Sequence, residues 1–370
     1  MKRILSLSLL LCLTLSLLCG CIGLPEGFGM TSQTLQSTET TAEAALPIDP
    51  AGGFRIHFID VGQADSALII CDGKTMLIDG GNRDDSNLIH SYLTKRGISY
   101  LDYVVATHAH EDHVGGLAGA LTAADAGVVM SPVTSYNTSA FNNFLNRVKA
   151  RNRTLTVPKA GDTFMLGSAS VTVLGPLKTN YEDVNDTSIV LRIVYGETSF
   201  LFTGDMEYIA EVDLLDSGAT LKSTLLKVGH HGSSSSTSYR FLREVAPKYG
   251  VISVGKDNDY GHPTETVLSR LRDADVTVFR TDERGDIICT SDGKTLTFTT
   301  SKGGAVNEGT NDGEQSTEAV TEYAYIGNLN SKKFHHAYCS SLPGEENRIY
   351  FTSKAEAQEK GYTACGICKP

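Results

Sequence analysis

Four residues within six positions have side chains that bind transition metals: His108, His110, Asp112 and His113. In extended backbone, alternate side chains point to one side, so His108 and His110 can converge on one ion. Asp112 and His113 stand at the start of a helix expected near Val114, where they can face a second ion. Imidazole and carboxylate together suit Zn²⁺, Mn²⁺ or Fe. A solvated histidine-rich loop is the alternative, and the buried strand expected directly before the motif argues against it.

Two later segments offer the remaining ligands. Asp205 ends a strand-like run, so its carboxylate can bridge both ions, and a turn residue is the alternative interpretation. His230 and His231 follow another strand-like run. We expect His230 to be the ligand because it lies at the strand end, and His231 remains the alternative.

A pair of such ions gives the site its expected chemistry. Two ions ~3.5–4 Å apart can hold a bridging hydroxide with a lowered pKa and clamp an anionic oxygen, which suits attack on phosphorus or on a carbonyl. Asp112 can orient or deprotonate the nucleophile. His262 can protonate the leaving oxygen or donate to a phosphate, and a structural loop histidine is its alternative interpretation.

Several polar residues are expected to support the ligands or contact substrate. They are Asp60, Asp79, Asn185, Asp186, His231, Ser233 and Asn258. Asp79 follows a strand and can accept a hydrogen bond from a ligand histidine, with a turn cap as the alternative. Ser233 begins a run of serines that also fits a flexible polar loop. Asp65 stays undecided between a site residue and a turn residue.

The elements that position these residues alternate along the chain. Strand-like runs cover 54–61, 66–72, 74–81, 101–108, 170–176, 188–196, 198–205, 224–231, 249–255, 276–281, 285–292 and 294–300. Helical patterns cover 86–97, 114–125, 139–152, 206–217, 236–246 and 264–274. Strands in each half of the chain with helices between them predict two sheets covered by helices, an α/β layered sandwich. Polar residues at the ends of buried strands are where such folds place their chemistry.

The core resembles the metallo-β-lactamase superfamily, and within it the β-lactamase-like part of the ComEC competence proteins. The matching segments occur in family order and are Ile59–Ser66, Ile78–Gly81, His108–His113, Asn185–Ser188, Gly204–Asp205, His230–Ser233 and Asn258–Pro263. The resemblance implies an αββα sandwich with two Zn or Mn ions between the sheets. The superfamily often has one more histidine ligand, but none occurs between 114 and 229. An oxygen of Asn185 or Asp186, or water, can take its place.

The N-terminal segment resembles a bacterial lipoprotein signal. Residues 1–21 contain Lys2 and Arg3, an apolar run and a lipobox-like end at Cys21, the expected lipidation site. An ordinary cleaved signal or an uncleaved anchor is the alternative. Residues 22–52 have the composition of a flexible tether. We therefore expect an exported protein that a lipid at Cys21 anchors to the outer face of the bacterial cytoplasmic membrane.

The C-terminal segment predicts a second metal site. A core over 53–300 is followed by a linker-like stretch over 301–320 and a small unit over 321–370. Three Cys and one His can close a tetrahedral structural zinc shell: His335, Cys339, Cys365 and Cys368. His336 is a substitute for His335, and a disulfide among the cysteines is the alternative. This α+β unit resembles the zinc-binding module of the Ada DNA-repair protein.

The net charge of the chain limits the class of substrate that it can bind. Lys and Arg total 32 against 43 Asp and Glu, a net charge of −11, which leaves no broad cationic footprint for duplex nucleic acid. The leading hypothesis is a phosphodiesterase, most plausibly a nuclease, acting through a metal-activated hydroxide. A lactamase or lactonase, a choline-phosphate esterase and a non-catalytic tethered binding protein are the alternatives. No protein partner is evident.

Overall fold

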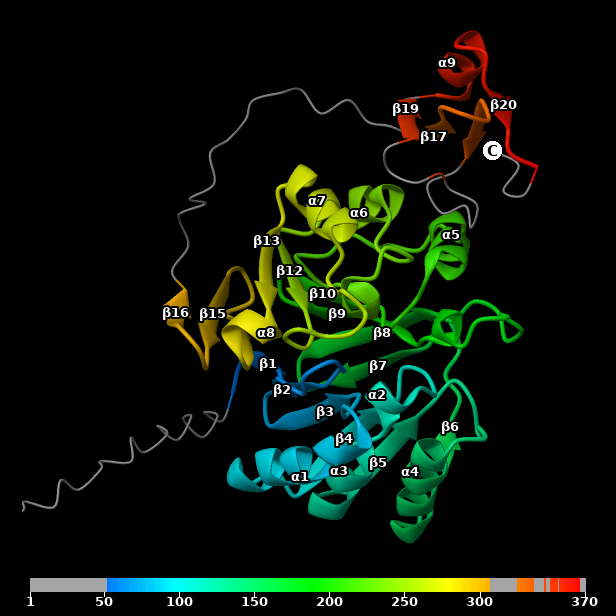
Figure 1. Cartoon of the computed structure of the whole chain (residues 1–370). Helices are drawn as coiled ribbons and strands as arrows, with labels where there is room; N and C mark the ends of the chain where they lie inside the picture. The colour runs from blue at the N-terminus through cyan, green and yellow to red at the C-terminus, as the bar shows by residue number, and fades with distance from the viewer. Residues whose placement is uncertain (1–51, 307–324, 336–342, 344–346, 352, 367–370) are drawn as a thin grey trace, which may run out of the picture. The chain divides into compact units, whose positions relative to one another are not determined.

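The computed structural model describes residues 52–306, 325–335, 343, 347–351 and 353–366 (Figure 1). Its larger sheet has nine strands. In spatial order they are β16 (Gly304–Val306), β15 (Leu296–Thr300), β14 (Ile287–Ser291), β1 (Phe54–Phe58), β2 (Ala67–Cys71), β3 (Lys74–Ile78), β4 (Tyr100–Val105), β5 (Asp125–Met130) and β6 (Leu155–Thr156). This order places the strands before Asp79 and before His108 next to each other.

The second sheet has seven strands. They are, in spatial order, β13 (Thr277–Arg280), β12 (Tyr249–Ile252), β11 (Leu225–Lys227), β10 (Thr198–Phe202), β9 (Val190–Tyr195), β8 (Ala169–Gly175) and β7 (Thr163–Leu166). β10, β11 and β12 are parallel neighbours, as are β3, β4 and β5 in the first sheet. The carboxyl ends of parallel neighbours meet at one edge, so the residues that follow these strands gather there.

Helices cover the outer face of each sheet (Figure 1). The first sheet carries α1 (Ser86–Lys95), α2 (Glu111–Val114), α3 (Leu117–Ala123) and α4 (Ser139–Ala150), and the second carries α5 (Tyr208–Asp216), α6 (Tyr239–Val245) and α7 (Glu265–Asp273). Shorter elements are α8 (Thr281–Arg284) and the 3-10 turns η1 (Arg83–Asp85), η2 (Asn185–Thr187) and η3 (Gly229–Gly232). The layers are therefore helix, sheet, sheet, helix, as the sequence predicted.

Alternating side chains explain this layering. Phe54 and Phe58 of β1 face the second sheet, where Phe54 stacks on Phe200 at 4.7 Å and Phe58 on Phe202 at 5.9 Å between ring centroids. In β2, Ile69 joins this central core, whereas its neighbour Leu68 packs with the helices on the outer face. A period of two gives each strand one face for each layer.

The helix after the metal-binding motif begins earlier than the sequence predicted. α2 starts at Glu111, with His110 as its N-cap, so Asp112 and His113 lie within its first turn. Gly116 then permits a close approach, because a Cβ there would lie 1.8 Å from the carbonyl oxygen of Gly80. This contact holds the turn after β3 against the motif and brings Asp79 to His113.

Four short strands and one helical turn escaped the sequence prediction. They are β5, β6, β7, β16 and α8. β16 pairs with β15, so residues 304–306, which composition assigned to the linker, belong to the first sheet. β6, β7 and β16 are short strands at sheet edges, so their hydrophobic pattern is weak, whereas β5 lies inside the first sheet and has only a short apolar run after Gly127. None of the helices in the described part of the chain has the length and apolarity needed to cross a membrane.

The C-terminal unit has its own four-stranded sheet. Its elements are β19 (Arg348–Phe351), β17 (Tyr325–Asn328), β18 (Lys333–His335) and β20 (Thr363–Ala364), with the helix α9 (Lys354–Glu359). Phe334, Phe351, Ala357 and Tyr362 form its small buried core. The unit is α+β, as predicted.

Candidate metal centre

Four ligand-type residues from three distant segments converge at the edge between the sheets. Ligand atoms of Asp112, His113, Asp205 and His231 all lie within 4.8 Å of one another. Asp205 is central, since its Oδ2 lies 3.2 Å from His113 Nε2 and 3.5 Å from His231 Nε2. Asp112 Oδ2 lies 3.3 Å from the same nitrogen of His231. Two carboxylates and two imidazoles form the ligand set that Zn²⁺ or Mn²⁺ prefers.

The unsatisfied atoms of this cluster point to a cation. His113 Nε2 and Asp205 Oδ1 are buried and have no hydrogen-bond partner. His113, Asp205 and His231 are each no more than 2% exposed. Buried carboxylates without enough donors are costly unless a cation compensates them. The residues present therefore fit a divalent ion.

The other two histidines of the motif face each other beside this cluster. His108 Nε2 lies 3.0 Å from His110 Nδ1, and the His108 ring lies 4.1 Å from that of His113. Two imidazole nitrogens so close together suit one shared ion. Neither His108 nor His110 has two other potential ligand atoms of the described residues close enough to complete a group of three within 4.8 Å. The four-residue cluster is thus the assembled site, and the pair offers part of a second one.

The structure places His231, and not the expected His230, among the clustered ligand atoms. His231 is 2% exposed and enters the cluster, whereas His230 lies at its rim with Nε2 3.8 Å from Asp205 Oδ2. Both residues adopt left-handed backbone, with φ of 49° and 51°. This conformation is uncommon for residues other than glycine and marks a functional constraint. It turns both imidazoles towards Asp205, which the position of a strand end could not predict.

Hydrogen bonds on Nδ1 fix the orientation of the clustered histidines. Asp79 Oδ2 lies 2.8 Å from His113 Nδ1 and also accepts from the hydroxyl of Thr107 at 2.7 Å. The carbonyl oxygen of Ser253 lies 2.9 Å from His231 Nδ1. In both cases Nε2 is left to face the cluster. Such partners fix the tautomer and raise the ligand's basicity.

Glu207 has the same relation to His230, a role that no pattern in the sequence indicated. One carboxylate oxygen, Oε1, lies 3.1 Å from His230 Nδ1 and accepts from Ser235 Oγ at 3.0 Å and Asn185 Nδ2 at 3.2 Å. The hydrogen bond from His230 holds the pKa of Glu207 below its ordinary value despite partial burial. Ser235, rather than the predicted Ser233, is the serine on this histidine, at 3.3 Å from Nδ1.

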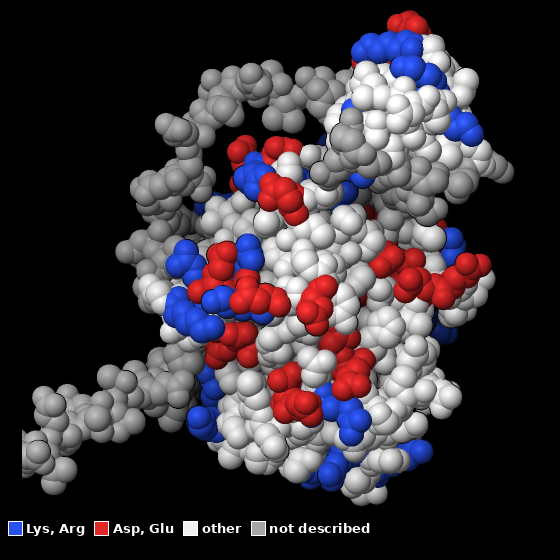
Figure 2. All heavy atoms as spheres, viewed as in Figure 1, with Lys and Arg blue, Asp and Glu red and all other residues white. Residues whose placement is uncertain are grey.

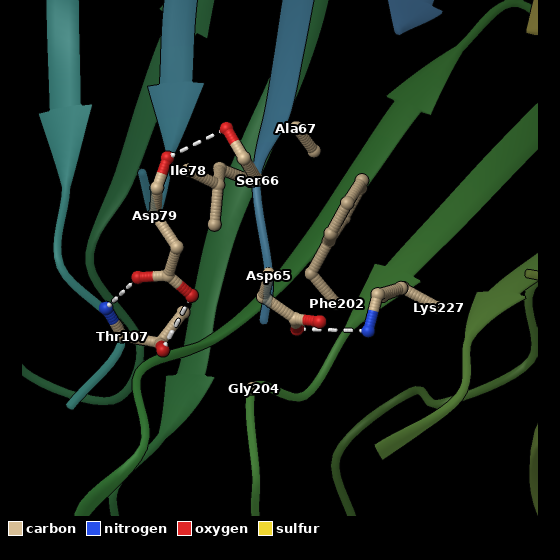
Figure 3. Close-up of a pocket in the computed structure, with 9 residues that line it drawn as sticks. All are labelled: Asp65, Ser66, Ala67, Ile78, Asp79, Thr107, Phe202, Gly204 and Lys227. Atoms are coloured by element: carbon tan, nitrogen blue, oxygen red, sulfur yellow. Dashed lines mark hydrogen bonds and ion pairs between the residues drawn. The ribbon is translucent and has the colours of Figure 1, made fainter. Parts of the chain in front are cut away.

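A small internal pocket lies between the sheets beside the cluster (Figure 3). In it Lys227 Nζ donates to Asp65 Oδ2 at 2.8 Å, and both side chains are at least nine-tenths buried. The other oxygen of Asp65 lies 3.3 Å from His231 Nδ1. Burial opposes the charge of Asp65, but Lys227 and His231 outweigh it and hold its pKa well below the usual range. Asp65 is thus a site residue, and Lys227 its internal counter-ion.

The charges of the cluster shift the pKa values of its members. Burial disfavours the charged form of His113 and of His231, yet Asp205 outweighs it and raises the pKa of both imidazoles well above their usual value. Those imidazoles in turn lower the pKa of the buried Asp205 and bring that of Asp112 to about 2. Protons on His113 and His231 and a metal ion therefore compete for one cluster.

Two residues predicted to support the ligands, Asp60 and Asp186, have other contacts. Asp60 accepts from the Gly62 backbone and from Lys302 Nζ, because the chain turns after Val61 and carries Asp65 inward instead. Asp186 accepts from the Glu207 and Ala210 backbone amides at the start of α5. Burial raises its pKa to about 6. These hydrogen bonds commit Asp186 to capping the helix.

Ser233 and Asn185 are two further residues that the sequence predicted to support the site. Ser233 is buried and bonds to Ser235 at 2.9 Å between hydroxyls. Asn185 is 7% exposed, and its Oδ1 is buried without a hydrogen-bond partner. Because Asn185 Nδ2 is engaged by Glu207, its Oδ1 keeps the capacity to accept a donor or a cation.

His262 lies beside the cluster but is not suited to be a charged acid. Its ring centroid lies 5.7 Å from that of His230. Burial and the nearby charge of His230 lower its pKa to about 4, so the imidazole is neutral at neutral pH. A neutral imidazole can still donate a hydrogen bond, which favours the predicted phosphate-contact role over proton transfer to a leaving group.

The predicted structural zinc shell lies partly within the described residues. His335 of β18 and Cys365 after β20 are both buried, and these strands are parallel neighbours. Two of the four proposed ligands therefore come from adjacent strands. Cys339 and Cys368 lie outside the described residues, as do His336 and Cys21.

Comparisons with known proteins agree with this geometry. Residues 59–256 match the metallo-beta-lactamase superfamily model, and residues 314–370 match the metal binding domain of Ada. ComE operon protein 3 of Bacillus subtilis (strain 168) is 29% identical over 250 residues, which cover 63% of this chain and 32% of that protein. Competence protein ComA of Neisseria gonorrhoeae is 29% identical over 265 residues, covering 71% and 36%.

The chain thus spans about a third of the length of these relatives. Among solved structures, the metallo-beta-lactamase fold protein YhfI of Bacillus subtilis is 12% identical with a TM-score of 0.41, covering 66% of this chain and 99% of that one. The match over 59–256 spans the described ligand cluster, which lies between two helix-covered sheets. The chain belongs to the metallo-beta-lactamase superfamily.

Proposed function

We propose that this member of a metal-dependent hydrolase family is a phosphodiesterase whose substrate is single-stranded or short nucleic acid. The observation that carries the proposal is the convergence of Asp112, His113, Asp205 and His231 within 4.8 Å, with His108 and His110 paired beside them. Four of these six side chains are buried, and no structural role requires so many imidazoles and carboxylates together.

The residues divide the work by position. A divalent ion bound here supplies Lewis acidity and lowers the pKa of water. Asp205 and His113 would hold it from the buried side, whereas the side chain of Asp112 is 32% exposed and could orient the attacking water. His262 is neutral and can donate to a phosphate oxygen at the rim. In-line attack on phosphorus needs a group that accepts a proton from the attacking water and a group that donates a hydrogen bond to the phosphate. Asp112 can be the acceptor and His262 the donor.

The kind of phosphodiester is inferred from the relatives and from the surface charge. One relative is named as a competence protein, and the ComEC resemblance links this core to nucleic acid. On the face shown in Figure 2, Asp and Glu gather across the middle, whereas Lys and Arg lie mostly towards its edges. A duplex needs a broad cationic surface, and this face does not offer one. Single strands and short oligonucleotides need less charge neutralisation.

A substrate panel tests the proposal. Zinc- or manganese-loaded protein is assayed on bis-p-nitrophenyl phosphate, single-stranded DNA, a choline-phosphate ester and a lactone, with bound metal measured in parallel. We expect phosphodiester cleavage that Asp205→Asn lowers by more than the ~10–100-fold typical of outer ligand partners. Asp275 is exposed and far along the chain from the ligands, so Asp275→Asn is the control variant.

Each alternative has its own outcome. Turnover of the lactone alone would replace the proposal with a carbonyl hydrolase, and turnover of the choline ester alone would replace it with a choline-phosphate esterase. Metal bound without any turnover would favour a binding protein.

The membrane tether is a separate proposal. We propose that Cys21 is lipidated, since it follows an apolar run and a small residue. Expression of the full chain in a bacterium, with fractionation of wild type and Cys21→Ala, tests this. Wild type is expected with the membranes and the variant in the soluble fraction; equal distribution would contradict the anchor.

A further inference from the structure

An exposed tyrosine leads a short series of rings into the metal centre. Tyr260 is 73% exposed, and its ring stacks on that of His262 at 5.7 Å with an angle of 27°. His262 in turn meets His230 edge-on at 5.7 Å. His230 lies 3.8 Å from Asp205. The outer face of Tyr260 is thus an aromatic surface close to the reaction centre.

Hydrogen bonds from one side chain hold this tyrosine in place. Asn258 donates from Nδ2 to the carbonyl oxygens of Gly255 at 2.9 Å and His262 at 2.6 Å. Its Oδ1 accepts from the backbone amides of Tyr260 at 3.2 Å and His262 at 3.1 Å. Both the donor and the acceptor of Asn258 are therefore used within its own loop. A loop fixed in this way presents Tyr260 with little ordering cost on binding.

The same loop is attached to the turn that carries His230 and His231. The amide and hydroxyl of Thr264 both donate to the Gly232 carbonyl oxygen, at 2.9 and 3.1 Å. A Cβ on Gly232 would lie 2.5 Å from Pro263 Cβ, so only glycine permits this contact. The position of Tyr260 is thereby tied to that of the metal ligands.

The surroundings of Tyr260 select the kind of group that can bind it. One face of the ring is covered by His262 and the other is open, which suits stacking of a planar ring. A quaternary ammonium group is instead recognised by aromatic cages. Asp257 and Asp259 precede the tyrosine and are exposed, as is Lys256, so this stretch has no net positive charge to attract a backbone phosphate. The surface therefore fits a base, and not the backbone, of a nucleic acid.

We propose that Tyr260, backed by His262, is a stacking platform for an unpaired base of single-stranded nucleic acid whose phosphodiester lies at the metal centre. This proposal rests on the proposed phosphodiesterase function and names its substrate class. Stacking needs an unstacked base, so the platform excludes a duplex and tolerates different base identities.

Oligonucleotides with a single abasic residue test the platform. The full chain loaded with zinc is assayed on a single-stranded oligonucleotide and on a series in which the abasic residue moves through the positions near the cleaved bond. Wild type, Tyr260→Ala and Tyr260→Phe are compared. We expect Tyr260→Ala to raise KM about 5- to 100-fold with kcat little changed, because the stacked base takes no part in the bond that breaks. Tyr260→Phe keeps the ring face and should resemble wild type.

The abasic series supplies the decisive readout. One position should lower wild-type binding by the same factor as Tyr260→Ala and have no further effect in that variant. Bound metal and hydrolysis of bis-p-nitrophenyl phosphate show that the variant is folded. If wild type cleaves the oligonucleotide but the series is flat and Tyr260→Ala has normal KM, the platform is refuted and the phosphodiesterase stands. Failure to cleave any phosphodiester refutes the proposed function, and a loss confined to a choline-phosphate ester reassigns Tyr260 to a cationic group.

Discussion

At the scale of single residues, the site depends on which nitrogen of each histidine is free. His113, His230 and His231 each have Nδ1 against an acceptor, respectively Asp79, Glu207 and the Ser253 carbonyl. Their Nε2 atoms are consequently turned towards Asp205. A histidine with the wrong tautomer would present a hydrogen and not a lone pair to an ion.

Glu207 provides the sharpest test of this arrangement. Glu207→Ala removes the acceptor that orients His230, whose Nε2 faces Asp205 from the rim, so we expect metal affinity and hydrolysis to fall by about 10-fold, the lower end of the effect of an outer ligand partner. Glu207→Gln keeps a carbonyl oxygen at the same position and should retain most of both. Affinity is measured by competition with a chelator, and Glu244→Ala on the exposed side of α6 is the control. Equal behaviour of the Ala and Gln variants would show that orientation is not the role of Glu207.

At the scale of elements, the two sheets are joined beneath the site by a buried ion pair. Asp65 comes from the loop after β1 and Lys227 from β11 of the other sheet. A buried pair gains little net stability, but removal of one partner leaves an uncompensated charge. The pair therefore fixes how the sheets meet at the edge that carries the ligands.

Breaking this pair should be far more costly than breaking an exposed one. We expect Lys227→Met to lower the free energy of unfolding by about 3–5 kcal/mol, because Asp65 stays buried and charged. The solvent-exposed pair Lys74–Asp102 is the control, and Lys74→Met should change the free energy of unfolding far less, because water screens the charges. Urea unfolding of metal-free protein measures both.

The double variant Asp65→Asn with Lys227→Met separates charge from packing. It should recover part of the loss, since no buried charge remains. A double variant no more stable than Lys227→Met would show that packing, and not the unpaired carboxylate, sets the cost.

At the scale of the whole molecule, proton binding and metal binding at the site are linked to folding. The raised pKa values of His113 and His231 mean that the folded protein binds these protons more tightly than the unfolded chain does. This stabilisation is complete below about pH 6.5, the ordinary histidine value, and is lost as pH rises through the folded pKa values. Asp205 behaves oppositely, since its lowered pKa gives stability that is lost as pH falls.

Metal removal should therefore matter more as pH rises. We expect the Tm of chelator-treated protein to fall from pH 6.5 upward, and the difference from zinc-loaded protein to widen, because the ion replaces the departing protons. Thermal unfolding with zinc or with chelator across this range measures the difference. Asp205→Asn should reduce it strongly at every pH. Parallel curves for the two forms would contradict the linkage.

The sequence by itself determined the layers and most of the ligands. Alternating hydrophobic residues specify strands that bury one face on each side, and twelve of the described strands lie in the strand-like runs, including those before Asp79, His108, Asp205 and His230. Polar residues that interrupt such runs stand out because burial there is otherwise apolar. The metal-binding motif was visible for the same reason, since His and Asp cluster at its strand end.

Only the tertiary structure decided which side chain enters the cluster. The choice of His231 over His230 depends on two left-handed residues, and that of Asp65 over Asp60 on a turn. Glu207 and Lys227 acquire their roles from partners far along the chain, as Asn185 and Asp65 show. A local sequence pattern indicates which side chains are buried and whether the segment is a strand or a helix. The contacts named above instead arise where the two sheets meet. Their geometry is set by packing across the interface, which no segment of the sequence contains alone.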